Sequence, residues 1–492
     1  MKNRKIAALL SIAAVAATWA FSFYPTVSAT QLVAQAQPQP ATHEHHQPSG
    51  ETSTATSALP GDRSQQIPGA PVMRLEDLEK MALESNPTFA QAEAAIRAAE
   101  GRRVQAGLFP NPIMGYAGSE LAPRAFSEKS EHGFFIEQTI PLGGKLSKSR
   151  AIFAQEKVQT EQSAVAQKQR ILNAVRILFY QALGAQQLVE VRGQLAKLAR
   201  EAVAITGELY NVGQADRPDA FQIQIEAERA QLDLVIAENE REQVWQQLGA
   251  VAGNPFLKPA RLAGTLESGL PVLEQETLLA KLLGESPELK RAQAGVERAK
   301  ATLTRAKVEP VPDLFVRGGF GYSTERLDSR NARPGQKTGP EGSLEVGLRI
   351  PLFNRNQGGI AAAAAEQEIA EREVRRVELM LRARAAAAFR SYLNALRVAT
   401  QYEQQIMPRA QRSYELYLGS FRQMAAAYPQ VLIAQRTLFQ VRADYVEALV
   451  SAWQNAVLLQ GLLLDGALDA PGGMSMEGGN PANRPANRED QR

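Results

Sequence analysis

The sequence predicts a mainly α-helical protein with a small β part, in which one unit, a β-hairpin joined to a long helical hairpin, occurs twice. The first observation is the duplication itself: Glu84-Ser85-Asn86-Pro87 recurs two hundred residues later as Gly284-Glu285-Ser286-Pro287. The second is a pair of long segments, nearly free of proline, with apolar residues at helical spacing. The third is a pair of short alternating segments in each copy. Such a repeat indicates that one supersecondary unit was duplicated.

Both copies carry the same landmarks in the same order. A first helix, with a capped start at Ser85-Asn86-Pro87, runs to two closely spaced prolines, and two strands follow. The repeat spacing is 200 residues before the loop between the strands, 210 after it and 207 farther on, so the second loop holds ten extra residues. The landmarks are Pro110 and Pro112 with Pro310 and Pro312, Ile140-Pro141-Leu142 with Ile350-Pro351-Leu352, Leu209-Tyr210 with Leu416-Tyr417, and Ala227-Glu228-Arg229 with Ala434-Gln435-Arg436.

The long helices are predicted from the spacing of their apolar residues. No proline occurs from Lys145 to Tyr210, and an apolar seam at three-four spacing predicts a coiled-coil helix about 100 Å long. Its copy runs from Arg355 to Tyr417 and is interrupted only by Pro408. Turns at 211–218 and 419–429 lead into returning helices, so we expect an extended bundle. The first seam comprises Leu188, Val191, Leu195, Leu198, Ala202, Ile205 and Leu209, and the last returning helix has Leu438, Val441, Tyr445 and Leu449.

The strand segments carry one apolar and one polar face. Apolar residues alternate with polar residues or glycine in Ser343–Ile350 and in Leu314–Tyr322, and less regularly in Phe134–Ile140 and Ile113–Ala117. Their length is near that of a tilted strand that crosses a bilayer. One alternative is a pair of ordinary hairpins that lie over the helices. Because four strands cannot close a membrane barrel, a membrane position requires several chains to share one barrel.

Composition excludes several classes of function. The net charge is only +3, with both signs interspersed, which argues against a nucleic-acid partner. There is no cysteine, so thiolate metal sites and disulfides are excluded. The helical body has no histidine, and neither a P-loop nor a Gly-x-Ser-x-Gly elbow occurs. We therefore expect neither enzymatic activity nor a cofactor.

The N-terminus has the layout of a secretory signal peptide. Basic residues precede an apolar run from Ile6 to Phe23, and a small-residue site at Val27-Ser28-Ala29 follows. A retained membrane anchor is the alternative. The chain then divides into a signal peptide (1–29), a disordered spacer rich in Gln, Pro and His (30–72), a first repeat (73–265), a second repeat (266–468) and a disordered tail (469–492).

In this order, the landmarks resemble the TolC family of outer-membrane efflux proteins. The resemblance rests on Asn86-Pro87, the paired Ile-Pro-Leu runs and Glu228–Leu232, and it covers about residues 73–468. It implies a homotrimer with a twelve-stranded β-barrel in outer-membrane lipid and an α-helical barrel across the periplasm. It also implies docking onto a periplasmic adaptor and an inner-membrane pump of the RND type, with export but no chemistry.

Within that family, the spacer and Ile-Pro-Leu-Gly-Gly-Lys at 140–145 favour the cobalt-zinc-cadmium (CzcC-type) branch of heavy-metal efflux. His43, His45 and His46 surround Glu44, and such donors bind Zn²⁺, Co²⁺ or Cu²⁺ loosely. An ordinary polar stretch in a spacer is the alternative. Metal cations are thus the expected cargo.

The resemblance also points to residues at the helical tips. Tyr210, Gly213 and Gly419 are candidates for adaptor docking, although a glycine at a helix end has a purely structural role as a C-cap. The family's acidic constriction falls near Gln430 and Ile433, neither of which is acidic. Other pore candidates are Asp216, Asp219 and Tyr417. Asp219 is alternatively the N-cap of the returning helix, and Tyr414, Tyr417 and Arg412 are candidates for a latch.

Two further functions compete with metal efflux. A drug-efflux or type I secretion channel of the outer membrane has the same architecture, because the inner-membrane partner selects the cargo. A periplasmic coiled-coil adaptor or structural protein is the rival from another class. Adaptors usually carry one helical hairpin flanked by small β-domains, whereas this chain has two, each preceded by its own strand pair.

Overall fold

A computed structural model describes residues 72–119, 130–213, 216–326, 337–423, 425 and 428–470. The chain divides into two units, Met1–Gln66 and Ile67–Arg492, and every described residue lies in the second. The signal peptide, the spacer with His43, His45 and His46, and most of the C-terminal tail therefore lie outside the described residues.

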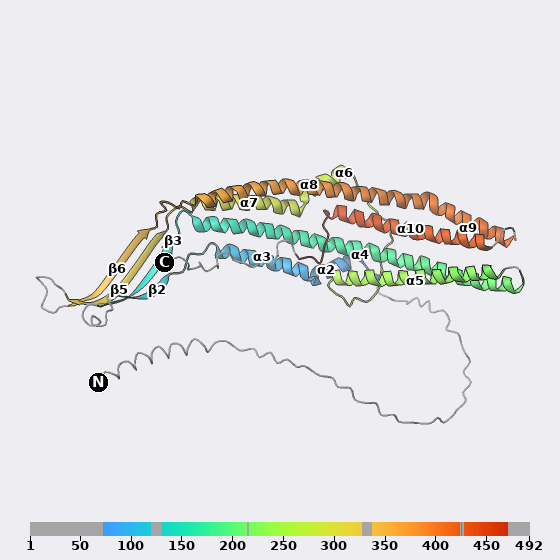
Figure 1. Cartoon of the computed structure of the whole chain (residues 1–492), viewed down its shortest axis with the longest axis horizontal. Helices are drawn as coiled ribbons and strands as arrows, with labels where there is room; N and C mark the ends of the chain where they lie inside the picture. The colour runs from blue at the N-terminus through green and yellow to red at the C-terminus, as the bar shows by residue number, and fades with distance from the viewer. Residues whose placement is uncertain are drawn as a thin grey trace, which may run out of the picture. The chain divides into compact units, whose positions relative to one another are not determined.

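The two halves of the second unit share one order of main elements, which is two short helices, two strands and a long helical hairpin (Figure 1). The first half comprises β1 (Val72–Met73), α2 (Leu75–Ser85), α3 (Pro87–Gln105), β2 (Ile113–Ser119), β3 (Glu131–Ile140), α4 (Lys145–Asn211), α5 (Arg217–Val251) and β4 (Arg261–Leu262). The second half comprises α6 (Gln275–Glu285), α7 (Pro287–Val308), β5 (Leu314–Arg326), β6 (Lys337–Leu348), α8 (Gln357–Gln401), the π-helix η1 (Tyr402–Ile406), α9 (Met407–Arg422) and α10 (Tyr428–Gln460).

The short and long helices begin as their sequences predict. Asn86 caps α3 by accepting from the Thr88 amide at 2.9 Å, and Ser286 caps α7 by accepting from the Leu289 amide at 3.4 Å. A proline occupies the first turn of each helix, where its missing N–H costs nothing. The predicted proline-free helix forms as one element, α4, of 67 residues.

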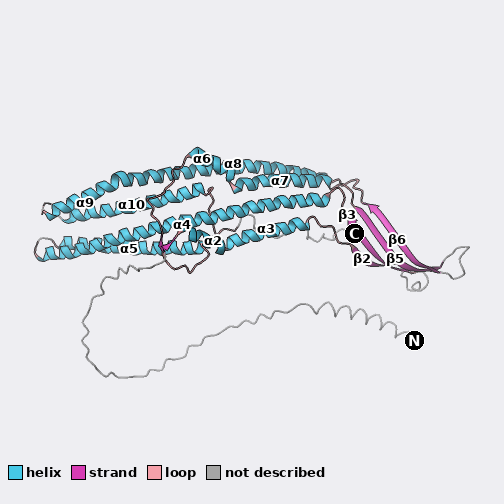
Figure 2. Ribbon diagram, turned by 180° about the vertical axis from the view of Figure 1, so that it is seen from behind, coloured by secondary structure: helices cyan, strands magenta, loops and turns pink. Residues whose placement is uncertain are grey.

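The β-hairpins lie at one end of the helices and the hairpin tips α4–α5 and α9–α10 lie at the other (Figures 1 and 2). The strands form one antiparallel sheet in the order β2-β3-β5-β6. The two hairpins are therefore joined through β3 and β5, where Phe134 lies opposite Phe320. A second, parallel pair joins β1 to β4 in the middle of the unit.

The core repeats one tryptophan contact in each half. Trp245 of α5 donates its indole N–H to the Leu257 carbonyl, and Trp453 of α10 donates to the Leu266 carbonyl, both at 2.8 Å. Both rings are buried, and Trp453 also stacks on Tyr180 with ring centroids 3.9 Å apart. The segment that links the halves is thus held by both returning helices.

Buried amides fasten the chain that follows α10. Gln167 donates to the Ala467 carbonyl and to the Thr88 hydroxyl, both at 2.8 Å. Asn173 donates to the carbonyls of Gly461 and Leu464 at 2.8 and 2.7 Å. Because a buried amide without partners is costly, these contacts specify where residues 461–467 lie against α4.

A left-handed turn converts each second strand into the long helix. Gly143 and Gly144 have φ of +67° and +69°, and Asn356, the N-cap of α8 as Gly144 is of α4, has φ of +57°. The next residue in the first copy, Lys145, is buried and forms an ion pair with Asp313 at 2.8 Å. The Ile-Pro-Leu-Gly-Gly-Lys run is therefore an elbow that also binds the first copy to the second.

Two sequence predictions about the first helical hairpin are wrong in detail. Ala202 of the predicted row is buried and Leu195 packs against the seam, but Ile205 is 40% exposed, and the buried seam at the tip also contains Ala196, Ala199 and Thr206. The alanines pack against Ala227 and Ala230 of α5, since small side chains allow the two helices to approach closely. Asp219 is not the N-cap of α5, because the helix begins at Arg217 with Asp216 in the capping position.

The second tip also differs from expectation. Gly419 does not end a helix, because α9 continues to Arg422. The predicted interruption at Pro408 is confirmed, because the α-helix gives way to the π-helix η1 just before the proline, whose missing N–H removes one helical hydrogen bond, and α9 continues beyond it. The predicted seam of α10, at Leu438, Val441, Tyr445 and Leu449, is buried.

Within the described ranges, no helix combines the length and the apolar character that crossing a membrane would require.

Replacement of Gly143 by Ala tests the elbow. A Cβ there would lie 2.9 Å from Val311 and would adopt an unfavourable φ, so we expect a loss of about 1–3 kcal/mol. Gly101→Ala is the matched control, because its Cβ meets nothing within 4 Å and alanine favours a helix by about 0.5–1 kcal/mol. Thermal melts of both variants by circular dichroism compare them, and equal midpoints would contradict this role.

Candidate functional site at the sheet and the helical tips

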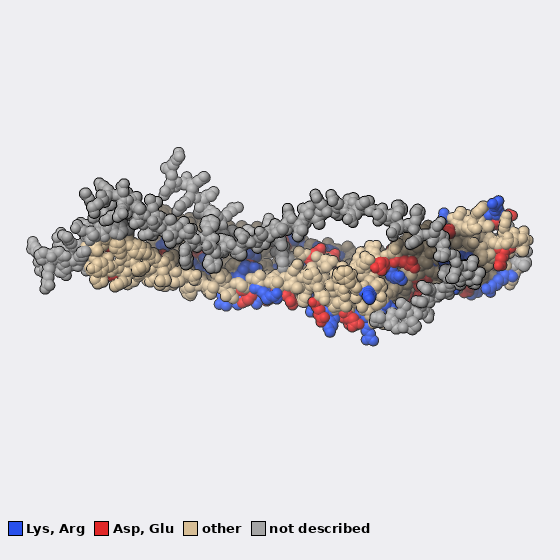
Figure 3. All heavy atoms as spheres, turned by 90° about the horizontal axis from the view of Figure 1, so that it is seen from below, with Lys and Arg blue, Asp and Glu red and all other residues tan. Residues whose placement is uncertain are grey.

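The sheet presents an apolar face to its surroundings. Directly opposed residues share a face, so Tyr116, Phe134 and Phe320 lie side by side. Met114, Phe134 and Leu344 are 77%, 74% and 76% exposed. In Figure 3 the visible surface of the sheet, at the left, has few charged side chains, whereas both signs are interspersed along the helices. Ile136, Tyr322, Val346 and Leu348 are also exposed on this face.

Within the part of the chain that the structure describes, the sheet has two edges without a partner strand. The edge strands are β2 and β6, each of which pairs on one side only within the described residues. Their outward N–H and C=O groups need partners wherever water is excluded. An exposed apolar face together with open edges is stable in lipid only when further strands complete the sheet.

The first helical tip ends in a glycine turn. The Gly213 amide donates to the Tyr210 carbonyl at 3.1 Å, and Gly213 adopts φ of +74°. Tyr210 and Val212 are exposed beside it, and nothing lies within 4 Å of a Cβ at Gly213. Asp216 is the N-cap residue of α5 and Asp219 lies in its first turn, where a carboxylate interacts favourably with the positive end of the helix dipole.

The second tip is closed by aromatic residues. Phe421 at the end of α9 and Tyr428 at the start of α10 have ring centroids 4.9 Å apart. Burial raises the pKa of Tyr428, and nearby Tyr414 and Glu201 act in the same direction. Glu201 belongs to α4, so the two tips are close at this point.

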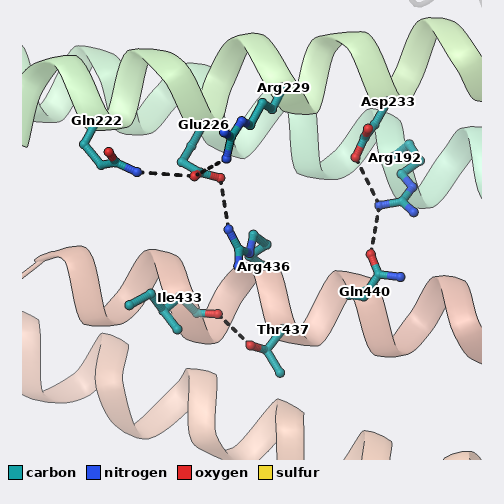
Figure 4. Close-up of polar contacts among 9 residues, drawn as sticks. All are labelled: Arg192, Gln222, Glu226, Arg229, Asp233, Ile433, Arg436, Thr437 and Gln440. Carbon is teal, nitrogen blue, oxygen red and sulfur yellow. Dashed lines mark hydrogen bonds and ion pairs between the residues drawn. The ribbon is translucent and has the colours of Figure 1, made fainter.

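A polar bridge joins the two helical hairpins behind the tips (Figure 4). Glu226 of α5 accepts from Arg229 at 3.4 Å and from Arg436 of α10 at 3.5 Å. Arg192 of α4 donates to Asp233 of α5 and to Gln440 of α10, both at 3.4 Å. Farther from the tip, Tyr402 of η1 donates to Asp444 at 3.2 Å. Burial raises the pKa of Tyr402, as does Asp444.

The bridge residues occupy equivalent positions in the two copies. Arg229 and Arg436 are 207 residues apart, which is the repeat spacing in this region, and so are Asp233 and Gln440. The match of Ala227-Glu228-Arg229 with Ala434-Gln435-Arg436 was therefore a usable signal for this site. Pairing across the hairpins was not predictable from it, because sequence spacing does not say which helix faces which.

The pore candidates proposed from the sequence lie around this bridge without joining it. Gln430 is exposed at the start of α10, and Tyr417 is 40% exposed on an open face of α9 with Leu416 and Arg412. No hydrogen bond or ion pair connects Asp216, Asp219, Tyr417 or Gln430 among the side chains that the structure describes. The described residues also contain no group of His, Asp and Glu that would hold a metal ion.

Comparisons with known proteins place the chain among channels. The sequence profile of the family "Outer membrane efflux protein" matches residues 78–254 and 278–463. The cobalt-zinc-cadmium resistance protein CzcC of Cupriavidus metallidurans is 26% identical over 392 residues, covering 80% of this chain and 90% of CzcC. The outer membrane protein TolC of Vibrio cholerae is 24% identical over 391 residues, covering 76% and 86%. The outer-membrane channel OprN shares the fold, with a TM-score of 0.65, 16% identity and coverage of 80% and 90%.

Loss of the bridge is expected to loosen the two hairpins. Exposed ion pairs contribute only about 0.2–1 kcal/mol each. Glu226→Gln or Arg436→Gln should therefore hardly change the free energy of unfolding, but should let the distance between α5 and α10 vary more widely. Spin labels attached to cysteines introduced at Gln224 of α5 and Gln430 of α10 report that distance, because the chain has no cysteine of its own to compete for the label. We expect a broader distance distribution in both variants.

The control for this experiment is Arg372→Gln, which removes an ion pair with Glu368 within α8. It should leave the distribution unchanged. A distribution in the Arg436 variant that matches wild type would show that the bridge does not hold the hairpins together.

Proposed function

The chain belongs to the outer membrane efflux protein family, whose members are channels and not enzymes, and we propose that three copies of it form one complete conduit. The sheets of the three copies share a twelve-stranded β-barrel in the outer membrane. The helical hairpins line a tunnel in the periplasm, which conducts substrate outward without chemistry.

The open-edged sheet is the observation that carries this proposal. Four strands per copy have an exposed apolar face and edges at β2 and β6. Pairing β6 of one copy with β2 of the next satisfies both edges at once. The twelve strands of three copies exceed the minimum of about eight strands that a closed membrane barrel needs.

Partners at the periplasmic end follow from the exposed tips. We propose that a periplasmic adaptor, coupled to an inner-membrane pump of the RND type, contacts the turn at Tyr210 and Gly213. Gly419 lies within α9, one turn before the second tip, and contributes there. Asp216, Asp219, Tyr417 and Gln430 stand near the entrance that these tips surround.

Heavy-metal cations are the cargo that we propose. The likeness to the cobalt-zinc-cadmium resistance protein supports this, since it extends over most of both chains. His43, His45 and His46 are suited to loose capture of such ions. A drug-efflux or secretion channel is the alternative, and the experiments below separate the two.

Assembly is tested by the mass of the protein extracted from outer membranes. Light scattering with the detergent contribution subtracted should give three chains, the number that the proposed twelve-stranded barrel requires, whereas a single copy leaves strand edges unpaired in lipid. A soluble monomer or dimer would instead indicate a periplasmic coiled-coil protein whose hairpins are surface features.

The cargo is tested with a deletion strain. We expect growth to become sensitive to cobalt, zinc or cadmium salts and to recover when the wild-type gene is restored. Replacing His43, His45 and His46 by Ala should lower tolerance only partly, because the tract precedes, in the sequence, the two repeats that form the proposed conduit. Unchanged metal tolerance with new sensitivity to organic drugs would favour the alternative cargo.

A further inference from the structure

The second face of the sheet is as distinctive as the apolar one. Its residues alternate with the exposed aromatics, and most are small: Gly115, Gly133, Gly319, Gly321 and Ser343. A hollow of about 300 Å³ lies on this side, lined among others by Phe135, Arg317, Glu341 and Glu345. In the proposed barrel this concave, polar face turns toward the lumen.

One row of charges crosses this face on three neighbouring strands. Glu137 of β3 lies directly opposite Arg317 of β5, and Arg317 lies directly opposite Glu345 of β6. Glu131 and Glu341 occupy the same face nearer the loops. Arg317 is the one cation on the face among the side chains that the structure describes, against four carboxylates.

Phe135 determines where the Arg317 charge lies. The Arg317 guanidinium stands over the Phe135 ring, with its central carbon 4.0 Å from the ring centroid. The ring in turn lies over Gly115 of β2, where a Cβ would come within 2.6 Å of it. Glycine at 115 therefore lets the ring lie flat against the wall, and the cation–π contact keeps the guanidinium near the wall as well.

We propose that the row Glu137–Arg317–Glu345 sets the ion preference of the barrel, with Phe135 as a positioning residue for Arg317. This rests on the proposed function, since it requires that three sheets close around a lumen. The glutamates attract cations into a narrow path between low-dielectric walls, where fields are focused. Arg317 limits that attraction, so the barrel passes cations without retaining them.

Ion preference is measured from reversal potentials in planar lipid bilayers under a KCl gradient. Arg317→Gln removes three positive charges per trimer and should raise the ratio of K⁺ to Cl⁻ permeability by about twofold or more at 0.1 M salt. Glu345→Gln and Glu137→Gln should lower it. Arg317→Lys keeps the charge and should match wild type.

The Phe135→Leu variant tests positioning separately, because it leaves every charge in place. We expect its permeability ratio to shift from wild type, which a merely structural role would not cause. If Arg317→Gln fails to assemble, the glutamate variants still test the row through a change of opposite sign.

The outcomes separate this inference from the proposed function. Variant channels that conduct with the wild-type permeability ratio would overturn the inference and leave the channel intact. A purified wild-type protein that forms no conducting pore would overturn the proposed function, and the inference with it.

Discussion

The constraint on which the rest of the structure depends is the need of backbone N–H and C=O groups for partners in lipid. Strands β2 and β6 leave one row of such groups open on each side of an apolar sheet. A chain with only one hairpin would leave the same backbone groups open, with fewer strands per chain to build a barrel. Duplication supplies two hairpins per chain, which β3 and β5 join into one sheet, so three chains are enough for a barrel of ordinary size. The helices follow from this arrangement, because each hairpin must be continued into the periplasm.

The elbows at the ends of β3 and β6 convert strand geometry into helix geometry. Both use left-handed residues, yet the chemistry differs: two glycines in the first copy and Asn356 in the second. Only the first elbow carries a buried lysine, and Lys145 pairs with Asp313 of the other copy. Removing Asp313 would leave the buried Lys145 charge with little access to water, which is strongly destabilising. The ion pair therefore fixes the angle between the two hairpins as well as the start of α4.

Much of the fold was predictable because its signals are periodic and local. Proline-free helical spacing predicted α4 almost to the residue, and alternation predicted all four strands of the larger sheet. The tips were less predictable. Larger apolar residues predicted the seam near Leu198 and Ile205, but the alanines there are more completely buried. The distance between the two helices decides which side chains fit, and the sequence spacing of apolar residues does not give that distance. Gly419 resembled a helix end, yet the next residues continue the helix, and no local pattern distinguishes a tolerated glycine from a capping one. The bridge at Glu226 needed the packing of α5 against α10, which only the tertiary structure provides.

That bridge depends on divergence between the two copies. Had the duplication remained symmetric, position 433 would hold a glutamate like Glu226, and position 440 an aspartate like Asp233. Each pair would then place like charges across the hairpins, and such pairs repel. Ile433 and Gln440 remove one carboxylate from each pair, so a single Glu226 accepts from two equivalent arginines, and Arg192 reaches one carboxylate and one neutral amide. The contact energies are small, because most of these side chains remain partly exposed. Links of this kind hold the two hairpins together, yet each of them breaks at little cost in free energy.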